Sequence, residues 1–98
     1  MKILLVCAGG FSTSILMNKV RKWAASNNED VRIDAMGKEA YENAWQNYDC
    51  ILIGPQISYT LDDIKENVSI PVAAINSMDY AVGNVENIMK LAHDITGK

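Results

Sequence analysis

The chain alternates between short apolar runs of strand length and longer stretches whose apolar residues recur at helical spacing. Two runs, Lys2–Cys7 and Cys50–Ile53, are almost continuously apolar, which is typical of strands buried on both faces. Two further strand-like runs cover residues 31–36 and 70–75. Helices are expected over four stretches, namely Ser12–Ser26, 40–48, 60–67 and 85–95.

This alternation of strand and helix predicts an α/β fold with a parallel sheet and helices on both faces. Right-handed crossovers favour a small doubly wound sheet of four strands in the order 2-1-3-4. Pro71 favours an edge position for the last strand, since proline removes a donor from the strand ladder. In this order ligands bind beyond the carboxyl ends of the first and third strands, where Cys7 and residues 54–59 lie.

Composition narrows the class of protein. The 98 residues suit one domain, 1–98, and 49% hydrophobic with 21% charged residues is ordinary for a globular chain. A net charge of −3 argues against a nucleic-acid partner. No run approaches the roughly 18 apolar residues of a membrane helix, and two cysteines without a signal peptide indicate a reducing cytoplasm.

Residues 7–14 read C-A-G-G-F-S-T-S and join the first strand to the first helix. The glycines allow backbone N–H groups to converge on an anion, and the helix N-terminus adds further N–H groups. The hydroxyl groups of Ser12, Thr13 and Ser14 add donors. The same features favour the thiolate form of Cys7, so the loop is suited both to activate a thiol and to hold phosphoryl oxygens around it.

The loop fits neither common nucleotide-binding motif, because G-x-x-x-x-G-K-[ST] and G-x-G-x-x-G are both absent. Its nearest physical analogue is the cysteine phosphatase loop C-x5-R-[ST], with Thr13 at the arginine position and Ser14 after it. Without the arginine that clamps the transferring phosphoryl group, hydrolysis should be slow. A phosphorylated Cys7 that resists hydrolysis is useful as a carrier.

Other chemically active side chains have structural interpretations. Cys50 begins an apolar strand, and we expect a buried thiol that is not in a disulfide with Cys7. His93 falls off the apolar stripe of the last helix, which predicts a solvated position, and a single histidine predicts no metal site. Thr60 and Asp63 fit a capping box at the start of the third helix.

The motif C-A-G-G-F-S-T-S resembles the active loop of enzyme IIB of the sugar phosphotransferase system (PTS), lactose/cellobiose family. I-G-P-Q-I-x-Y at 53–59 is similar to that family's second loop. I-P-V-A-A-I, followed by Asp79 and Tyr80, is similar to its fourth strand and the loop after it. The resemblance covers essentially all 98 residues, is greatest to free-standing chains of the cellobiose or diacetylchitobiose type, and implies a fold like that of low-molecular-weight tyrosine phosphatases.

The resemblance also implies a mechanism. Cys7 would accept a phosphoryl group from a phosphohistidine of IIA and donate it to a β-linked disaccharide, such as cellobiose, chitobiose or lactose, during transport through the membrane protein IIC. The chain would then be a protein-phosphocysteine–sugar phosphotransferase, without cofactor or metal. Gln56 and Tyr59 would flank the site from the second loop. The phosphoryl group would be held by the loop residues Ala8, Gly9, Gly10, Phe11, Ser12, Thr13 and Ser14.

The same resemblance places the chain in the cytoplasm, transiently at the inner face of the membrane. We expect a monomer, because a carrier presents one face to two partners in turn. Phe11 either packs into the core or contacts a partner protein. Two alternatives to the carrier remain open: a hydrolase like the low-molecular-weight tyrosine phosphatases, and a flavodoxin-like module that binds flavin or a nucleotide.

Overall fold

Four parallel strands in the order β2-β1-β3-β4 form the sheet of the computed structural model, which describes residues 1–7, 12–37 and 39–98. This is the predicted order. The central strands β1 and β3 pair along Ile3–Val6, and β2 and β4 form the two edges. The strand bounds are Lys2–Cys7 for β1, Arg32–Gly37 for β2, Cys50–Ile53 for β3 and Val72–Ala74 for β4.

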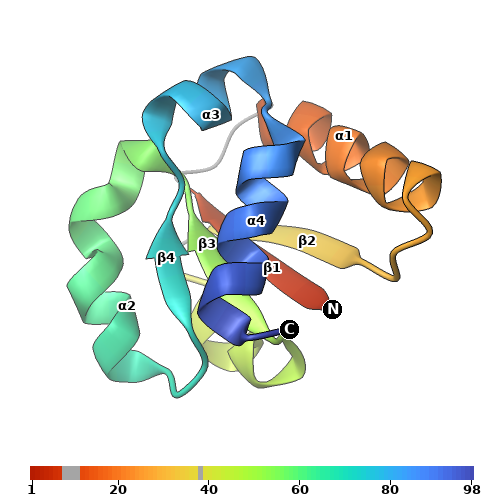
Figure 1. Cartoon of the computed structure of the whole chain (residues 1–98). Coiled ribbons are helices and arrows are strands. Elements are labelled where there is room, and N and C mark those ends of the chain that lie inside the picture. The colour runs from red at the N-terminus through yellow and green to blue at the C-terminus, as the bar shows by residue number, and fades with distance from the viewer. Residues whose placement is uncertain (8–11, 38) are drawn as a thin grey trace.

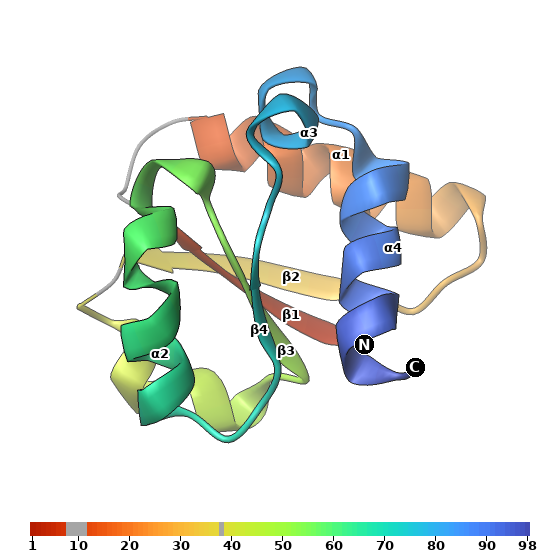
Figure 2. The ribbon, with the colours of Figure 1, turned by 60° about the vertical axis from the view of Figure 1, so that its left-hand side comes forward.

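Helices cover both faces of the sheet, as Figures 1 and 2 show. Helices α1 (Ser12–Ser26) and α4 (Val85–Thr96) lie on one face. Helix α2 (Leu61–Asn67) lies on the other, together with the short 3-10 helices η1 (Tyr41–Asn43) and η2 (Trp45–Asn47). Helix α3 (Ser77–Val82) follows β4 at the carboxyl end of the sheet.

The continuous apolar runs of β1 and β3 supply two separate cores, because successive strand residues point to opposite faces. Ile3 and Leu5 pack with α1 and α4, whereas Leu4 and Val6 pack with α2 and η1. Every one of these four side chains is fully buried. At about 25 cal/mol per Å² of apolar surface, this two-sided burial is the main force that holds the helices against the sheet.

The predicted helix over 40–48 is wrong. The chain forms two 3-10 helices instead, η1 (Tyr41–Asn43) and η2 (Trp45–Asn47), separated at Ala44, whose φ of −128° is not helical. The apolar side chains Tyr41, Trp45 and Tyr48 still pack on the sheet. Their spacing of three or four residues fits consecutive 3-10 turns as well as an α-helix, so periodicity alone predicted the wrong kind of turn.

The predicted capping box at Thr60 is also wrong. The chain enters α2 directly from a third 3-10 helix, η3 (Pro55–Thr60), so Thr60 already has right-handed helical angles. The Thr60 side chain accepts no capping hydrogen bond, and the N–H of Leu61 donates to the Ser58 carbonyl. The Thr60 hydroxyl instead donates to the Ile57 carbonyl at 2.6 Å.

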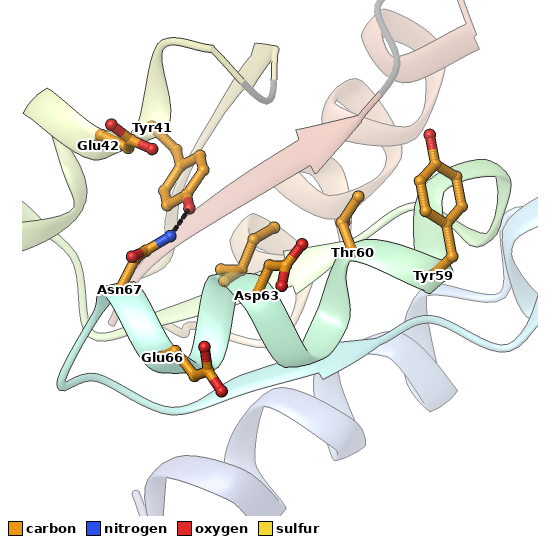
Figure 3. Close-up of a pocket in the computed structure, with 8 residues that line it drawn as sticks. Tyr41, Glu42, Tyr59, Thr60, Asp63, Glu66 and Asn67 are labelled. Atoms are coloured by element: carbon orange, nitrogen blue, oxygen red, sulfur yellow. Dashed lines mark hydrogen bonds between the residues drawn. The ribbon is translucent and has the colours of Figure 1, made fainter.

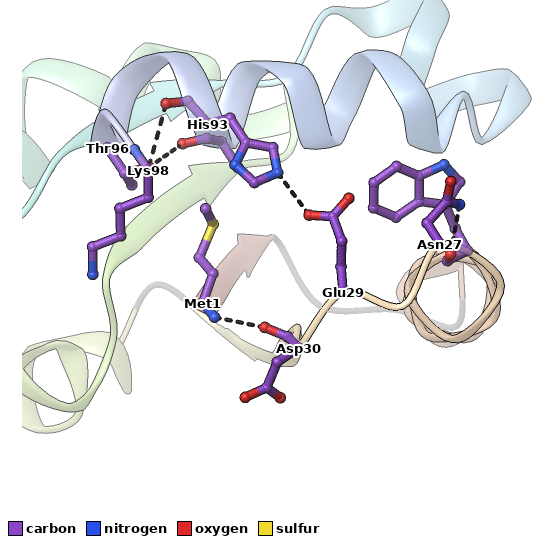
Figure 4. Close-up of polar contacts among 9 residues, drawn as sticks. Met1, Asn27, Glu29, Asp30, His93, Thr96 and Lys98 are labelled. Carbon is purple, nitrogen blue, oxygen red and sulfur yellow. Dashed lines mark hydrogen bonds and ion pairs between the residues drawn. The ribbon is translucent and has the colours of Figure 1, made fainter.

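The chain termini lie side by side at the end of the sheet opposite α3 (Figures 1 and 2). The Met1 ammonium donates to the Asp30 carbonyl at 2.6 Å, one of the contacts in Figure 4.

In the same view, His93 Nε2 lies 3.1 Å from Glu29 Oε1, with about a third of each side chain exposed. His93 therefore joins α4 to the turn before β2, and it is partly exposed at the predicted position off the apolar stripe. Across residues 1–7, 12–37 and 39–98, no helix has the length and apolar character to cross a membrane.

Candidate functional site

Cys7 is the last residue of β1 and lies at the carboxyl edge of the sheet. Its side chain is buried, with 5% of its surface exposed, and its thiol contacts the Met36 carbonyl of β2 at 3.9 Å. Helix α1 begins five residues later at Ser12, so the segment that links them starts and ends at this edge. The chain therefore leads from a buried thiol to a helix N-terminus, and helix N-termini are suited to bind anions such as phosphate.

Part of the predicted cradle lies outside the described residues, namely Ala8, Gly9, Gly10 and Phe11. Ser12 and Thr13 open α1, and Ser14 is exposed in the same first turn. Their role as phosphoryl-binding groups stays a prediction. What the structure adds is the surroundings of Cys7 on its other sides.

Gly54 borders Cys7 from the neighbouring strand. It directly follows β3, and its N–H donates to the Val6 carbonyl at 3.0 Å, so the backbones of β1 and β3 stay paired up to this point. A Cβ atom added to Gly54 would lie 3.6 Å from Cys7 Cβ, 3.8 Å from Tyr80 Cε2 and 3.0 Å from Gln56 Oε1. The φ of Gly54 is −63°, so the backbone does not require glycine here, and a single methyl group would meet Cys7 and Tyr80 at ordinary contact distances.

Tyr80 lies close to Cys7, although the sequence resemblance implied only that it follows the fourth strand. It lies on α3, half-buried, and packs against the core formed with α1 and α4. An open groove next to it is lined by Pro55, Gln56, Ser77, Tyr80 and Ala81. In the sequence, α3 is marked by its two cap residues, Asn76 before its first turn and Gly83 after its last residue.

The structure separates the two residues that were expected to flank the site from the second loop. Gln56 lines the groove beside Tyr80, with its Oε1 over Gly54. Tyr59 is 73% exposed and lines a different hollow, along α2, with Tyr41 and Asp63 (Figure 3). Both assignments stay predictions. Of the two residues, Gln56 is the one that lies beside Gly54, which in turn borders Cys7.

The basic residues nearest the loop in sequence are engaged in structural contacts. Lys19 Nζ donates to the Val82 carbonyl at the end of α3, at 3.4 Å. Arg21 donates to the Ile33 carbonyl of β2 at 3.1 Å. Neither side chain is therefore held in place as the phosphoryl clamp of a phosphatase.

Cys50 lies at the amino end of β3, at the opposite edge of the sheet from Cys7. It is fully buried and free, as expected, and burial raises the pKa of its thiol to about 11. A thiol with that pKa stays protonated and is a poor nucleophile at neutral pH. In the described part of the chain, no group of three His, Cys, Asp or Glu side chains could hold a metal ion.

Comparison with known proteins places this fold and site in one group. Residues 2–91 match the family described as the PTS system, lactose/cellobiose-specific IIB subunit. The oligo-β-mannoside-specific EIIB component of Bacillus subtilis is 34% identical over 86 residues, covering 85% of this chain and 84% of its own. The cellobiose-specific EIIB component of Lactococcus lactis is 29% identical, covering 95% and 94%. A lactose-specific EIICB component of Lactococcus lactis is 33% identical over 63 residues, and the match spans 11% of that longer protein.

Solved structures agree. The cellobiose-specific phosphotransferase IIB component of Borrelia burgdorferi superposes with a TM-score of 0.84 at 33% identity, over 99% of this chain and 92% of that one. The lactose-specific IIB domain of Streptococcus pneumoniae has the same fold, with a TM-score of 0.81 at 20% identity over 92% and 95%.

A four-stranded parallel sheet in the order 2-1-3-4, with a buried thiol at the carboxyl end of a central strand, defines a domain of the phosphatase-like fold. The chain belongs to the PTS lactose/cellobiose-specific IIB subunit family. It is thus an EIIB component, and components of this kind act in sugar phosphotransfer.

Proposed function

We propose that the whole chain, 1–98, is a single IIB domain that carries a phosphoryl group on Cys7 between a IIA protein and a sugar. The observation that carries this proposal is the place of Cys7, a thiol at the carboxyl end of β1 with the N-terminus of α1 close behind it. Positive partial charge at a helix N-terminus stabilises both a thiolate and the phosphoryl group that it takes up.

Cys7 is favoured over Cys50 as the nucleophile. The loop side of the sheet, where ligands bind in such folds, carries Cys7, whereas Cys50 lies at the other end of its strand. The pKa of about 11 also keeps the Cys50 thiol protonated. Of the two, only Cys7 can meet a partner's phosphoryl group without unfolding of the sheet.

The proposed reaction has two displacements at phosphorus. In the first, the Cys7 thiolate attacks the phosphorus of a phosphohistidine on IIA; an S–P bond forms, the N–P bond breaks, and its electron pair returns to the imidazole. In the second, a sugar hydroxyl oxygen attacks the phosphocysteine; an O–P bond forms, the thiolate leaves, and the hydroxyl proton goes to solvent. Both leaving groups depart readily, so positioning and charge stabilisation supply most of the catalysis.

The number and the contacts of the arginines favour a carrier over a hydrolase. The chain has only two, Arg21 and Arg32. Arg21 is held against the Ile33 carbonyl, and Arg32 lies 3.8 Å from Asp34 on the edge strand β2. A phosphatase needs an arginine that clamps the phosphoryl group in the transition state. The flavin or nucleotide module is the weaker alternative, because both common nucleotide-binding motifs are absent.

The partners follow from the family and from the names of the relatives. The EIICB relatives carry IIC and IIB in one name, which supports a IIC permease as the second partner. Relatives named for cellobiose, lactose and oligo-β-mannosides support a β-linked sugar as the acceptor, and one relative is named for the monosaccharide galactose. We propose a cytoplasmic monomer that meets IIC at the inner face of the membrane.

A comparison of two phosphoryl donors tests this function. The protein is incubated with phosphorylated IIA, and separately with a chromogenic aryl phosphate. We expect uptake of one phosphoryl group per chain from IIA and no sustained release of the aryl alcohol. Steady turnover of the aryl phosphate would instead establish the hydrolase, and a yellow protein with tightly bound flavin would establish the flavin module.

A further inference from the structure

We propose that Tyr80 shields the phosphorylated Cys7 from water, so that the phosphoryl group reaches the sugar instead of being lost as inorganic phosphate. This inference rests on the proposed function, because it concerns the lifetime of the phosphocysteine. It assigns a positioning role to α3.

A ring carbon of Tyr80 lies beside Gly54, at the carboxyl edge of the sheet. A Cβ atom on Gly54 would be in ordinary van der Waals contact with both Tyr80 Cε2 and Cys7 Cβ. The Tyr80 ring and the Cys7 side chain are therefore separated by no more than the space that one side-chain carbon would fill.

The atom of Tyr80 nearest to Gly54 is a ring carbon, Cε2. The ring therefore borders this space with the C–H edge next to its hydroxyl group, and the same residue lines the groove formed with Pro55 and Gln56. An apolar surface beside a phosphocysteine can exclude water but offers it no proton. We accordingly assign the effect to the ring and not to the hydroxyl group.

Helix α3 has only six residues, yet it is held firmly at both ends. Asn76 Oδ1 accepts hydrogen bonds from the N–H groups of Met78 and Asp79, at 2.8 and 3.4 Å. Asn87 of α4 donates to Asp79 Oδ1 at 3.0 Å. These contacts fix the turn that carries Tyr80, which an isolated helix of this length could not do.

The far end of α3 is closed by Gly83. Its φ of +65° lies in the left-handed region, and its N–H donates back to the Asp79 and Tyr80 carbonyls. A Cβ atom at this position would lie 2.7 Å from Lys19 Nζ, so the glycine also leaves room for the lysine that bonds to the Val82 carbonyl. Helix α1, which begins at the loop, is thereby connected to α3.

A phosphocysteine has two competing fates. In transfer, the sugar hydroxyl attacks phosphorus. In hydrolysis, a water oxygen attacks instead; an O–P bond forms, the S–P bond breaks, the Cys7 thiolate leaves, and inorganic phosphate takes the water's proton or releases it to solvent. The leaving group is the same in both, so the outcome depends on the nucleophile, its orientation and its access to phosphorus. A wall that excludes water until the acceptor arrives favours transfer.

The test measures the lifetime of the phosphorylated protein. The wild type and the variants Tyr80→Ala, Tyr80→Leu, Tyr80→Phe and Met78→Ala are phosphorylated from IIA and freed of the donor. Loss of one phosphoryl mass is then followed by intact mass spectrometry at neutral pH. Met78 is the matched control, because it lies on α3 with 67% of its surface exposed.

We expect Tyr80→Ala to lose its phosphoryl group about tenfold faster than the wild type, a change of ~1.4 kcal/mol in the barrier. Tyr80→Phe and Met78→Ala should decay like the wild type, and Tyr80→Leu between these limits. Tyr80→Leu decides the matter if the alanine variant unfolds, since it keeps an apolar side chain in the core. Equal decay in the wild type and the folded Tyr80 variants would overturn the shield alone, whereas a wild type that gains no phosphoryl mass from IIA would overturn the proposed function and the shield with it.

Discussion

Gly54 and Cys7 lie side by side at the carboxyl ends of β3 and β1, so close that a Cβ atom on Gly54 would be 3.6 Å from Cys7 Cβ. The N–H of Gly54 donates to the carbonyl of Val6, the residue before the thiol. The distance is therefore set by the backbones of two paired strands, which are buried from Ile3 to Cys7 and from Cys50 to Ile53. Rigid strands hold the nucleophile, and the segments that follow them supply its surroundings.

Substitutions of Gly54 should separate stability from transfer. In Gly54→Ala the new methyl group has room beside Cys7 and Tyr80 and displaces only the flexible end of Gln56. Gly54→Val adds two methyl groups against the same neighbours, and overpacking of this kind costs about 1–3 kcal/mol. We expect the alanine variant to melt near the wild-type temperature and the valine variant to melt lower and accept phosphoryl more slowly. A valine variant that melts and reacts like the wild type would contradict the tight packing at Gly54.

The second loop offers a paired comparison. Gln56 Oε1 lies over Gly54, whereas Tyr59 lines the separate hollow along α2. We expect Gln56→Ala to slow phosphoryl uptake by about tenfold, the effect of ~1.4 kcal/mol in the barrier. Tyr59→Ala should slow it less. Rapid-quench mass spectrometry of both variants against one phosphorylated IIA measures the difference, and a larger loss in Tyr59→Ala would reverse the assignment.

Two substitutions of the α3 cap residue Asn76 should differ in their effect on stability. Asn76→Ala removes the acceptor for two N–H groups at the start of the helix, which should cost about 1 kcal/mol of unfolding free energy. Asn76→Asp keeps an acceptor and adds a negative charge at the positive end of the helix, so its stability should match the wild type. Urea unfolding measures both. An alanine variant as stable as the aspartate variant would show that the cap does not hold α3.

A pH dependence is expected at the terminal edge of the sheet. The Lys98 ammonium and the Lys2 N–H, each 2.7 Å from an Asp49 carboxylate oxygen, lower the pKa of Asp49. Because the folded-state pKa lies below the unfolded value of about 3.9, this contribution is present above that pH and is lost as the pH falls through the folded value.

The magnitude should be modest, since Asp49 is about a third exposed and an ion pair of this kind is worth about 1 kcal/mol or less. Asp49→Asn should therefore lower the melting temperature slightly at pH 7, and the difference from the wild type should shrink toward pH 3. A difference that grows on acidification would mean that the carboxylate is not stabilised by its partners.

The sheet was predictable because its signals are local. Runs such as Cys50–Ile53 are apolar at every position, which is typical of a strand that is buried on both faces. The turns around Tyr41 and Trp45 were not, since 3-10 and α-helical turns place apolar residues at nearly the same spacing. Helix α3 was not predicted, because six residues are too few to show a helical spacing of apolar side chains.

The candidate site likewise has a part that the sequence predicts and a part that it does not. Cys7 and its loop form one continuous motif, so the chemistry could be inferred from adjacent residues. The place of Tyr80 depends on distances among three segments that are far apart in the sequence, ending at Cys7, Gly54 and α3. No spacing rule connects such segments, and only the folded chain brings them together.

Intact mass spectrometry under non-acidic conditions tests the central claim most directly. The wild type, Cys7→Ser and Cys50→Ala are each incubated with phosphoenolpyruvate, enzyme I, HPr and a cellobiose-type IIA that is itself confirmed as phosphorylated. The account predicts a gain of one phosphoryl mass in the wild type and in Cys50→Ala, and none in Cys7→Ser. A gain that persists in Cys7→Ser would contradict it, because the phosphoryl group would then be carried elsewhere in the chain.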